Sequence, residues 1–160
     1  MDFKNGAELL KLCSENDIKI SEAMRLRELG SSELKRPELD ELMKKKLDIM
    51  KEAVRHPIES PAASMGGLIG GEAKKLDDQR LLGRNICGPV VSKAIAYAMA
   101  VLEVNASMGL IVAAPTAGSS GVVPGVLISL QEEYGFSDES LVDALFNASA
   151  IGYLAMRNAT

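Results

Sequence analysis

The sequence is poor in aromatic residues. Tryptophan is absent and aromatic side chains make up 4% of the 160 residues, against eight methionines. A β-sheet core draws on aromatic and β-branched side chains, whereas small and flexible aliphatic side chains suit close helix packing. We therefore expect an all-α fold. A chain of this length can bury one substantial core.

Cysteine is also scarce, since only Cys13 and Cys87 are present. They provide no disulfide framework and fit a reducing compartment. Cys13 lies beside leucines on an apolar helical face, which predicts a small core residue. Cys87 precedes Gly88 and Pro89, and receives the same interpretation. The first residues contain no apolar stretch suited to a signal peptide, so we expect a cytoplasmic protein.

Positive charge is not in excess, because the formal net charge is −4. Nucleic-acid binding needs a cationic face, so nucleic acid is not an expected partner. Long apolar runs are missing as well. In the Ala-rich stretch that follows Pro89, Lys93 and Glu103 leave fewer than the roughly 18 uninterrupted apolar residues that a membrane span requires. A membrane is therefore not an expected partner either.

Apolar residues that recur every three or four positions, together with capping residues, outline the expected helices. An Ala-rich helix that follows Gly88 and Pro89 is apolar on nearly every face, so we expect it to be buried on all sides. The other expected helices run from Glu22 to Gly30 with Ser21 as N-cap, from Pro37 to His56 with Pro57 closing the segment, from Pro124 to a C-cap at Gly135, and onward from an N-cap at Ser137.

Two glycine-rich stretches interrupt the helical pattern. "SPAASMGGLIGGEAKKL" (60–76) contains two glycine pairs, which favours a turn or a ligand-facing loop. "AAPTAGSSGVVPG" (113–125) places hydroxyls and amides just before a helix N-terminus, an arrangement that binds small anions such as carboxylate. The alternative for this second stretch is an interhelical turn satisfied by its own backbone.

Three stretches, taken in order, carry a family resemblance: "SMGGLIGGEAKKL" (64–76), "AMAVLEVNASMGLIVAAPTAGSSGVVPGVL" (98–127) and "AIGYLAMRNAT" (150–160). Together they closely resemble the α-chain, or catalytic domain, of the iron–sulfur-dependent L-serine dehydratases. The resemblance implies that residues 60–160 are the N-terminal part of that catalytic domain, and that residues 1–59 form an N-terminal helical segment.

The resemblance also implies an activity. A [4Fe–4S] cluster with one open iron acts as a Lewis acid on the hydroxyl group of L-serine, and elimination of water leads to pyruvate and ammonia. Such an enzyme serves amino-acid degradation and gluconeogenesis in the cytoplasm, with a separate β-chain as partner. In the family the cluster cysteines lie beyond the phrase "RNAT". A cluster needs about three or four thiolates, so we expect no metal in this chain and no activity from it alone.

The resemblance assigns substrate-binding roles to residues of both glycine-rich stretches: Ser64, Met65, Gly66, Gly67, Thr116, Ala117, Gly118, Ser119, Ser120 and Gly121. Lys75 is a candidate base or carboxylate partner, with a solvated helical lysine as the alternative. Glu103 and Asn105 are costly within a buried helix unless they are paired. They either line the active site or satisfy the backbone of a glycine-rich loop. The catalytic base stays unidentified, and serine is not distinguished from threonine.

A second hypothesis is a cofactor-free helical module whose glycine-rich loops bind a small anion or a partner subunit. His56 precedes Pro57 at a helix end and is expected to be structural. Near the C-terminus, the apolar face of Leu141, Leu145 and Ile151 is expected to be exposed when downstream helices are missing, which favours a homo-oligomer.

Overall fold

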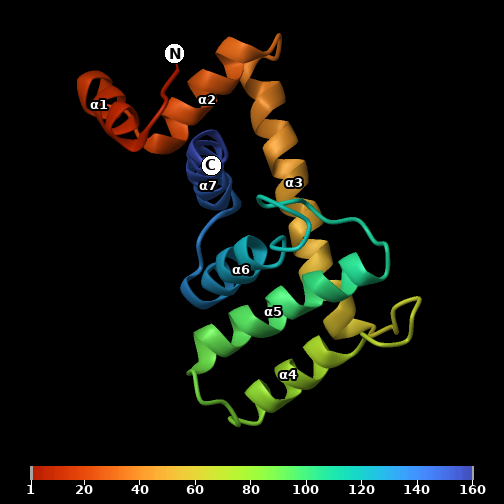
Figure 1. The fold of residues 1–160 in the computed structure, drawn as a ribbon. Coiled ribbons are helices and arrows are strands. Elements are labelled where there is room, and N and C mark those ends of the chain that lie inside the picture. The colour runs from red at the N-terminus through yellow and green to blue at the C-terminus, as the bar shows by residue number, and fades with distance from the viewer. Residues whose placement is uncertain (1, 160) are drawn as a thin grey trace. The chain divides into compact units, whose positions relative to one another are not determined.

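A computed structural model describes residues 2–159, in which seven helices and no strand are present. The helices are α1 (Gly6–Asn16), α2 (Ile20–Ser31), α3 (Arg36–Glu59), α4 (Glu72–Leu81), α5 (Pro89–Ala106), α6 (Val122–Tyr134) and α7 (Asp138–Asn158) (Figure 1). The expectation of an all-α fold is confirmed. Within the same residues, none of the helices has the length and hydropathy to cross a membrane.

The chain divides into two compact units. The first unit comprises residues 1–45 and 138–160, and therefore joins the two ends of the chain. The second comprises residues 46–137, so α3 contributes to both. The predicted boundary of the catalytic domain at residue 60 is a statement about family relationship, and it stays a prediction.

In the first unit, α2 packs against α7 around a buried arginine. The Arg25 guanidinium lies over the ring of Phe146, 4.2 Å from its centroid. It also pairs with Asp40 at 2.8 Å and with Asp143 at 2.7 Å. The buried cation is thus matched by two carboxylates, as a charge with 8% exposure requires. Leu141 and Leu145 are buried within this unit and only Ile151 is exposed, so the expected exposure of the α7 apolar face is wrong for two of its three residues.

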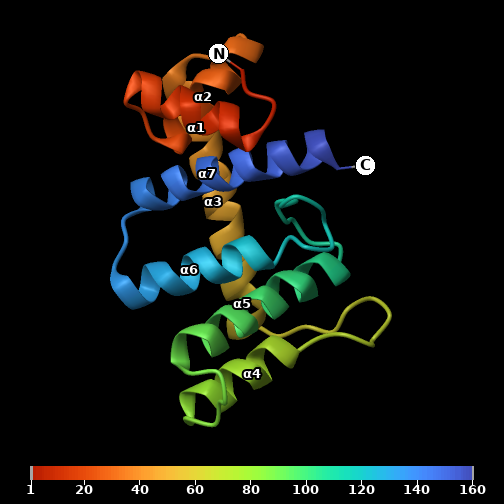
Figure 2. The same ribbon diagram turned by 60° about the vertical axis from the view of Figure 1, so that its left-hand side comes forward.

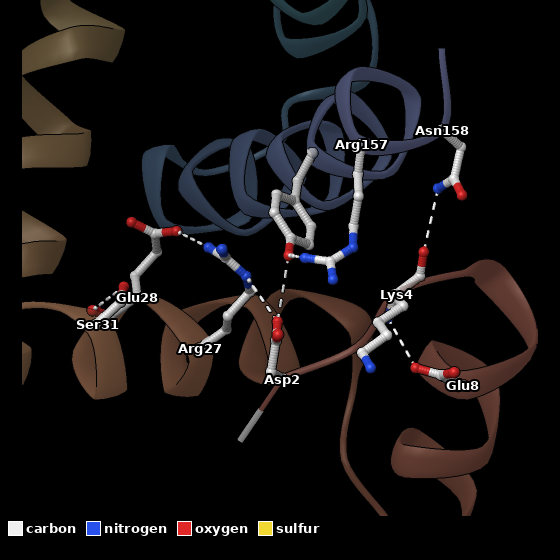
Figure 3. A network of polar contacts seen from close by, with 9 residues as sticks. Asp2, Lys4, Glu8, Arg27, Glu28, Ser31, Arg157 and Asn158 are labelled. Atoms are coloured by element: carbon white, nitrogen blue, oxygen red, sulfur yellow. Dashed lines mark hydrogen bonds and ion pairs between the residues drawn. The ribbon is translucent and has the colours of Figure 1, made fainter. Parts of the chain in front are cut away.

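A polar network attaches the N-terminal residues to α2 and α7 (Figure 3). The Asp2 carboxylate accepts hydrogen bonds from Arg27 of α2 at 3.2 Å and from the Tyr153 hydroxyl of α7 at 3.3 Å. The Asn158 amide donates to the Lys4 carbonyl at 3.1 Å. The Tyr153 ring also meets the buried ring of Phe3 edge-on, with centroids 5.5 Å apart. The first residues and the last helix are therefore held to one another.

In the second unit, α5 lies between α4 and α6, and the three helices run side by side (Figure 2). Small residues let α5 and α6 approach closely. A Cβ added to Gly121 would lie 2.4 Å from the Ala98 carbonyl oxygen, and one added to Gly125 would lie 2.7 Å from that of Ala94. The two glycines are one helical turn apart, and so are the two alanines. The glycines at the start of α6 therefore face the alanines of α5. This is the close helix packing that the small-residue composition predicts.

Several helix boundaries were predicted correctly. Helix α5 begins at Pro89, α6 ends at Gly135 in the left-handed conformation (φ 71°), and α7 begins directly after Ser137. Gly135 donates its N–H to the Gln131 carbonyl at 2.8 Å, which is the C-cap geometry that glycine accepts at no steric cost.

Other boundaries were wrong by up to a turn. Ser21 is a buried residue inside α2 and not its N-cap, because the helix already starts at Ile20. Pro57 lies inside α3, where Ser60 still donates to the His56 carbonyl, since one missing N–H in the last turn does not end a helix. Helix α6 starts two residues before Pro124, which occupies the first turn, where an N–H has no helical partner.

Candidate functional site

Both glycine-rich loops lie at the same end of the second unit. Because α4, α5 and α6 are antiparallel neighbours, the start of α4, the end of α5 and the start of α6 come together (Figure 2). We call residues 60–71 the first loop and residues 107–121 the second loop. The Glu103 carboxylate accepts the N–H of Ala73 at 2.8 Å, which directly joins the end of α5 to the start of α4.

The first loop is closed by Ser64. Its backbone N–H donates to the Ile69 carbonyl at 2.6 Å, and its hydroxyl oxygen accepts the Ile69 N–H at 3.2 Å. Met65 is 88% exposed, and a Cβ added to Gly66 or Gly67 would meet nothing within 4 Å. Of the predicted binding residues in this loop, Ser64 thus shapes the turn while Met65, Gly66 and Gly67 project from it.

Two carboxylates, those of Glu72 and Glu103, accept backbone hydrogen bonds at the start of α4. Glu72 accepts the N–H of Gly70 at 2.6 Å. Hydrogen bonds from the backbone N–H groups of Gly70 and of Glu72 itself hold the pKa of the Glu72 carboxyl below its usual value, and the charge of Lys75 acts in the same direction. Lys75 is exposed, as in the solvated alternative. Its role as base or carboxylate partner stays a prediction.

The second loop satisfies many of its own polar groups. The Ser120 hydroxyl donates to the Ala117 carbonyl at 2.7 Å and is buried. The hydroxyls of Thr116 and Ser119 lie 3.0 Å apart, and Ser119 also contacts the Ala114 carbonyl at 3.3 Å. These bonds agree with a self-satisfied turn in the ligand-free chain. They leave the predicted carboxylate cradle, which includes Gly118 and Gly121, as a proposal.

Glu103 and Asn105 each bind one of the two loop regions. Glu103 reaches Ala73 at the end of the first loop, and the Asn105 amide donates to the Ala117 carbonyl of the second loop at 3.3 Å. Both residues therefore satisfy loop or helix-start backbone, which was one of the two sequence alternatives. The Oε2 atom of Glu103 is different: it is buried and has no hydrogen-bond partner among residues 2–159.

An apolar groove of about 270 Å³ runs beside the second loop, lined by α5 residues including Ile95, Met99 and Leu102 and by Gly118, Ser120 and Val122. The expectation that α5 is buried on all sides is wrong, because Val91, Ile95 and Leu102 are 39–52% exposed. Its charged residues point to neighbouring helices: Lys93 pairs with Glu132 and Glu133 of α6. The outward face is therefore apolar.

The two cysteines lie in different units. Cys13 is half-buried in α1 of the first unit, and Cys87 lies in the second unit just before α5. Cys87 is exposed, so its interpretation as a core residue is wrong; the glycine and proline that follow it hold it in a surface connection. Among residues 2–159, no group of three or more His, Cys, Asp or Glu side chains is placed to hold a metal ion. His56 is exposed near the end of α3.

Sequence reasoning missed Glu72. A signal was present, because a glutamate that directly follows a glycine pair at a helix start is well placed to accept free backbone N–H groups. Its proximity to Glu103 had no sequence signal, since the two residues are separated by 31 positions and meet only when α4 packs on α5.

Proteins similar to this chain include α-chains of L-serine dehydratases. Residues 4–160 match a family model described as "Serine dehydratase alpha chain". The chain is 37% identical over 158 residues to a "Probable L-serine dehydratase, alpha chain" of Bacillus subtilis, covering 99% of this chain and 52% of that protein. It is 32% identical to the "L-serine dehydratase, alpha chain" of Peptoniphilus asaccharolyticus, covering 99% and 54%. The chain thus spans about half the length of these relatives.

Proposed function

The chain belongs to the serine dehydratase α-chain family, and from that membership we propose that it supplies the substrate-binding loops of an enzyme that converts L-serine to pyruvate and ammonia. The family match across residues 4–160 carries the proposal. The meeting of both glycine-rich loops at one end of the second unit supports it, because residues 50 positions apart must converge to surround one small substrate.

The substrate carboxylate is the group that this chain is best suited to bind. The N-terminus of α6 lies at the loop end, and that helix has no side-chain N-cap hydrogen bond. At the start of α4, by contrast, Glu103 already accepts the N–H of Ala73. Free N–H groups and the positive ends of helix dipoles favour an anion. Ser119 and Ser120 stand next to the start of α6 and would turn their hydroxyl hydrogens from loop carbonyls to the carboxylate.

The residues of this chain do not fit an iron–sulfur cluster. A cluster needs about three or four cysteine thiolates, and the two cysteines here lie one in each unit. We therefore derive no catalytic step through a cluster from these residues. If the complete enzyme uses the cluster that the resemblance implies, its ligands lie outside this chain.

The proposal extends to partners and location. The relatives named as α-chains imply a β-chain, and we propose that the complete enzyme combines both. We also propose that it acts in the cytoplasm in the degradation of L-serine. Formation of a homo-oligomer belongs to the same proposal, and sedimentation velocity of the purified chain measures it directly.

The test is a pyruvate assay on the complete enzyme, with α- and β-chains assembled and the cluster reconstituted anaerobically. Ser119→Ala and Ser120→Ala are expected to raise KM for L-serine about 10-fold or more, since each removes a hydrogen bond to a charged group worth roughly 1.5–3 kcal/mol. Ser129→Ala is the matched control, because that buried hydroxyl donates to the Val126 carbonyl further along α6.

An unchanged KM in both loop variants would reduce the second loop to a structural turn. Absence of pyruvate from the cluster-loaded enzyme would refute the dehydratase proposal. In that case, the cofactor-free module that binds a small anion or a partner subunit becomes the better description.

A further inference from the structure

The Glu103 carboxylate has an unused oxygen in an unusual place. The residue is 3% exposed, and its Oε1 atom accepts the N–H of Ala73 in the first turn of α4. Its Oε2 atom is shielded from solvent and has no hydrogen-bond partner within residues 2–159. A buried carboxylate oxygen without a donor loses its hydration and gains nothing in exchange, so this position costs folding free energy unless something else binds it.

The neighbouring lysines do not supply the missing donor. Glu72 lies next to Glu103, and the pKa of its carboxyl is lowered by N–H donors from Gly70 and from its own backbone and by a hydrogen bond with the Glu103 side chain. Lys74 is paired with Asp78, and Lys75 is exposed. Two adjacent carboxylates with one buried free oxygen are satisfied by a proton that they share or by a positively charged donor from outside the described residues.

We propose that the free oxygen of Glu103, together with Glu72, is the subsite for the α-ammonium group of an amino acid that binds between the two glycine-rich loops. An ammonium group carries three N–H donors and needs no further protein ligands. A metal ion fits less well, because no third ligating side chain stands at this position among residues 2–159. The inference rests on the proposed function and deepens it, since the N-terminus of α6 would take the carboxylate of the same molecule.

The loop that precedes α4 is free to move at its tip. The first loop directly precedes α4, and its tip at Gly66 and Gly67 is unpacked, with nothing within 4 Å of an added Cβ. A shift of the tip therefore breaks no side-chain packing. Asn105, two residues from Glu103, holds the second loop through the Ala117 carbonyl. The end of α5 thus keeps the second loop in place, while the tip of the first loop is free of packing contacts at Gly66 and Gly67.

The experiment compares ligands that differ in one group. Binding to the purified 160-residue chain is measured by titration NMR with L-serine and with 3-hydroxypropionate, which lacks only the ammonium. Wild-type chain is expected to bind L-serine about 10- to 100-fold more tightly, the effect of a charge-assisted hydrogen bond. Glu103→Gln keeps an oxygen for the Ala73 N–H and is expected to abolish the difference. Glu133→Gln, the same change at the far end of α6, should preserve it.

Two results would overturn the inference. One is equal or undetectable binding of both ligands by wild-type chain, which needs no variant and holds even if Glu103→Gln fails to fold. The other is a folded Glu103→Gln chain that still prefers L-serine.

Failure of the proposed function looks different from failure of this inference. Pyruvate formation by the complete enzyme with an unchanged KM in Glu103→Gln would support the dehydratase proposal and refute the ammonium subsite. Ammonium-dependent binding without pyruvate formation would support the ammonium subsite and refute the dehydratase proposal.

Discussion

Replacing Gly125 by alanine tests the close contact between α5 and α6. The new Cβ would lie 2.7 Å from the Ala94 carbonyl oxygen and 2.9 Å from the Ala98 amide nitrogen. Both are backbone atoms, so the helices must separate by several tenths of an ångström. Overpacking of this kind costs about 1–3 kcal/mol, while alanine in a helix interior regains roughly 1 kcal/mol over glycine. We expect a net loss of about 0–2 kcal/mol in the free energy of unfolding.

The control is the same exchange where there is room. Gly152 lies inside α7, and an added Cβ there meets nothing within 4 Å. Gly152→Ala should therefore gain about 0.5–1 kcal/mol from helix propensity alone. Urea unfolding followed by far-UV circular dichroism measures both variants. Equal stability of the two variants, or a Gly125→Ala chain more stable than wild type, would refute the argument that glycine is required by the helix approach.

Three further predictions concern the charged groups and the cysteines. Arg25→Met should lower the stability of the first unit by about 3–5 kcal/mol, because Asp40 and Asp143 lose their buried partner; a variant that also carries Asp143→Asn should recover part of this loss in the same urea assay, and no recovery would contradict the pairing. Hydrogen bonds from Arg36, at 2.5 and 2.6 Å, hold the pKa of Glu22 below its usual value. The resulting stabilisation is present above that value and is lost as the pH falls through the lowered pKa. Glu22→Gln should therefore weaken the fall of the free energy of unfolding at acid pH. An unchanged acid dependence would show that the pair contributes nothing. With a thiol-specific reagent, the exposed Cys87 should react faster than the half-buried Cys13, and Cys87→Ser should remove the fast phase; a fast phase that persists in Cys87→Ser would contradict the burial assigned to Cys13.

The candidate site shows where reasoning from sequence stops. Local composition located both loops, because glycine pairs, serines and a helix start are visible within a short window. It could not decide between a carboxylate cradle and a self-satisfied turn, since the partners of Ser119 and Ser120 depend on how the loop folds back on Ala114 and Ala117. The unpaired oxygen of Glu103 was equally invisible, because it depends on which side chains α4 brings to α5.

By itself the sequence determined the helical class and several helix boundaries, because periodicity, proline and glycine act over a few residues. Family membership was also readable from the order of three stretches, and the family match agrees with it. Only the tertiary structure decided which faces are covered. It buries Ser21, Leu141 and Leu145, and it exposes Cys87 and one side of α5. Burial follows from contacts between residues far apart in the chain, such as those that join α2 to α7 across more than a hundred positions. No local pattern encodes that distance.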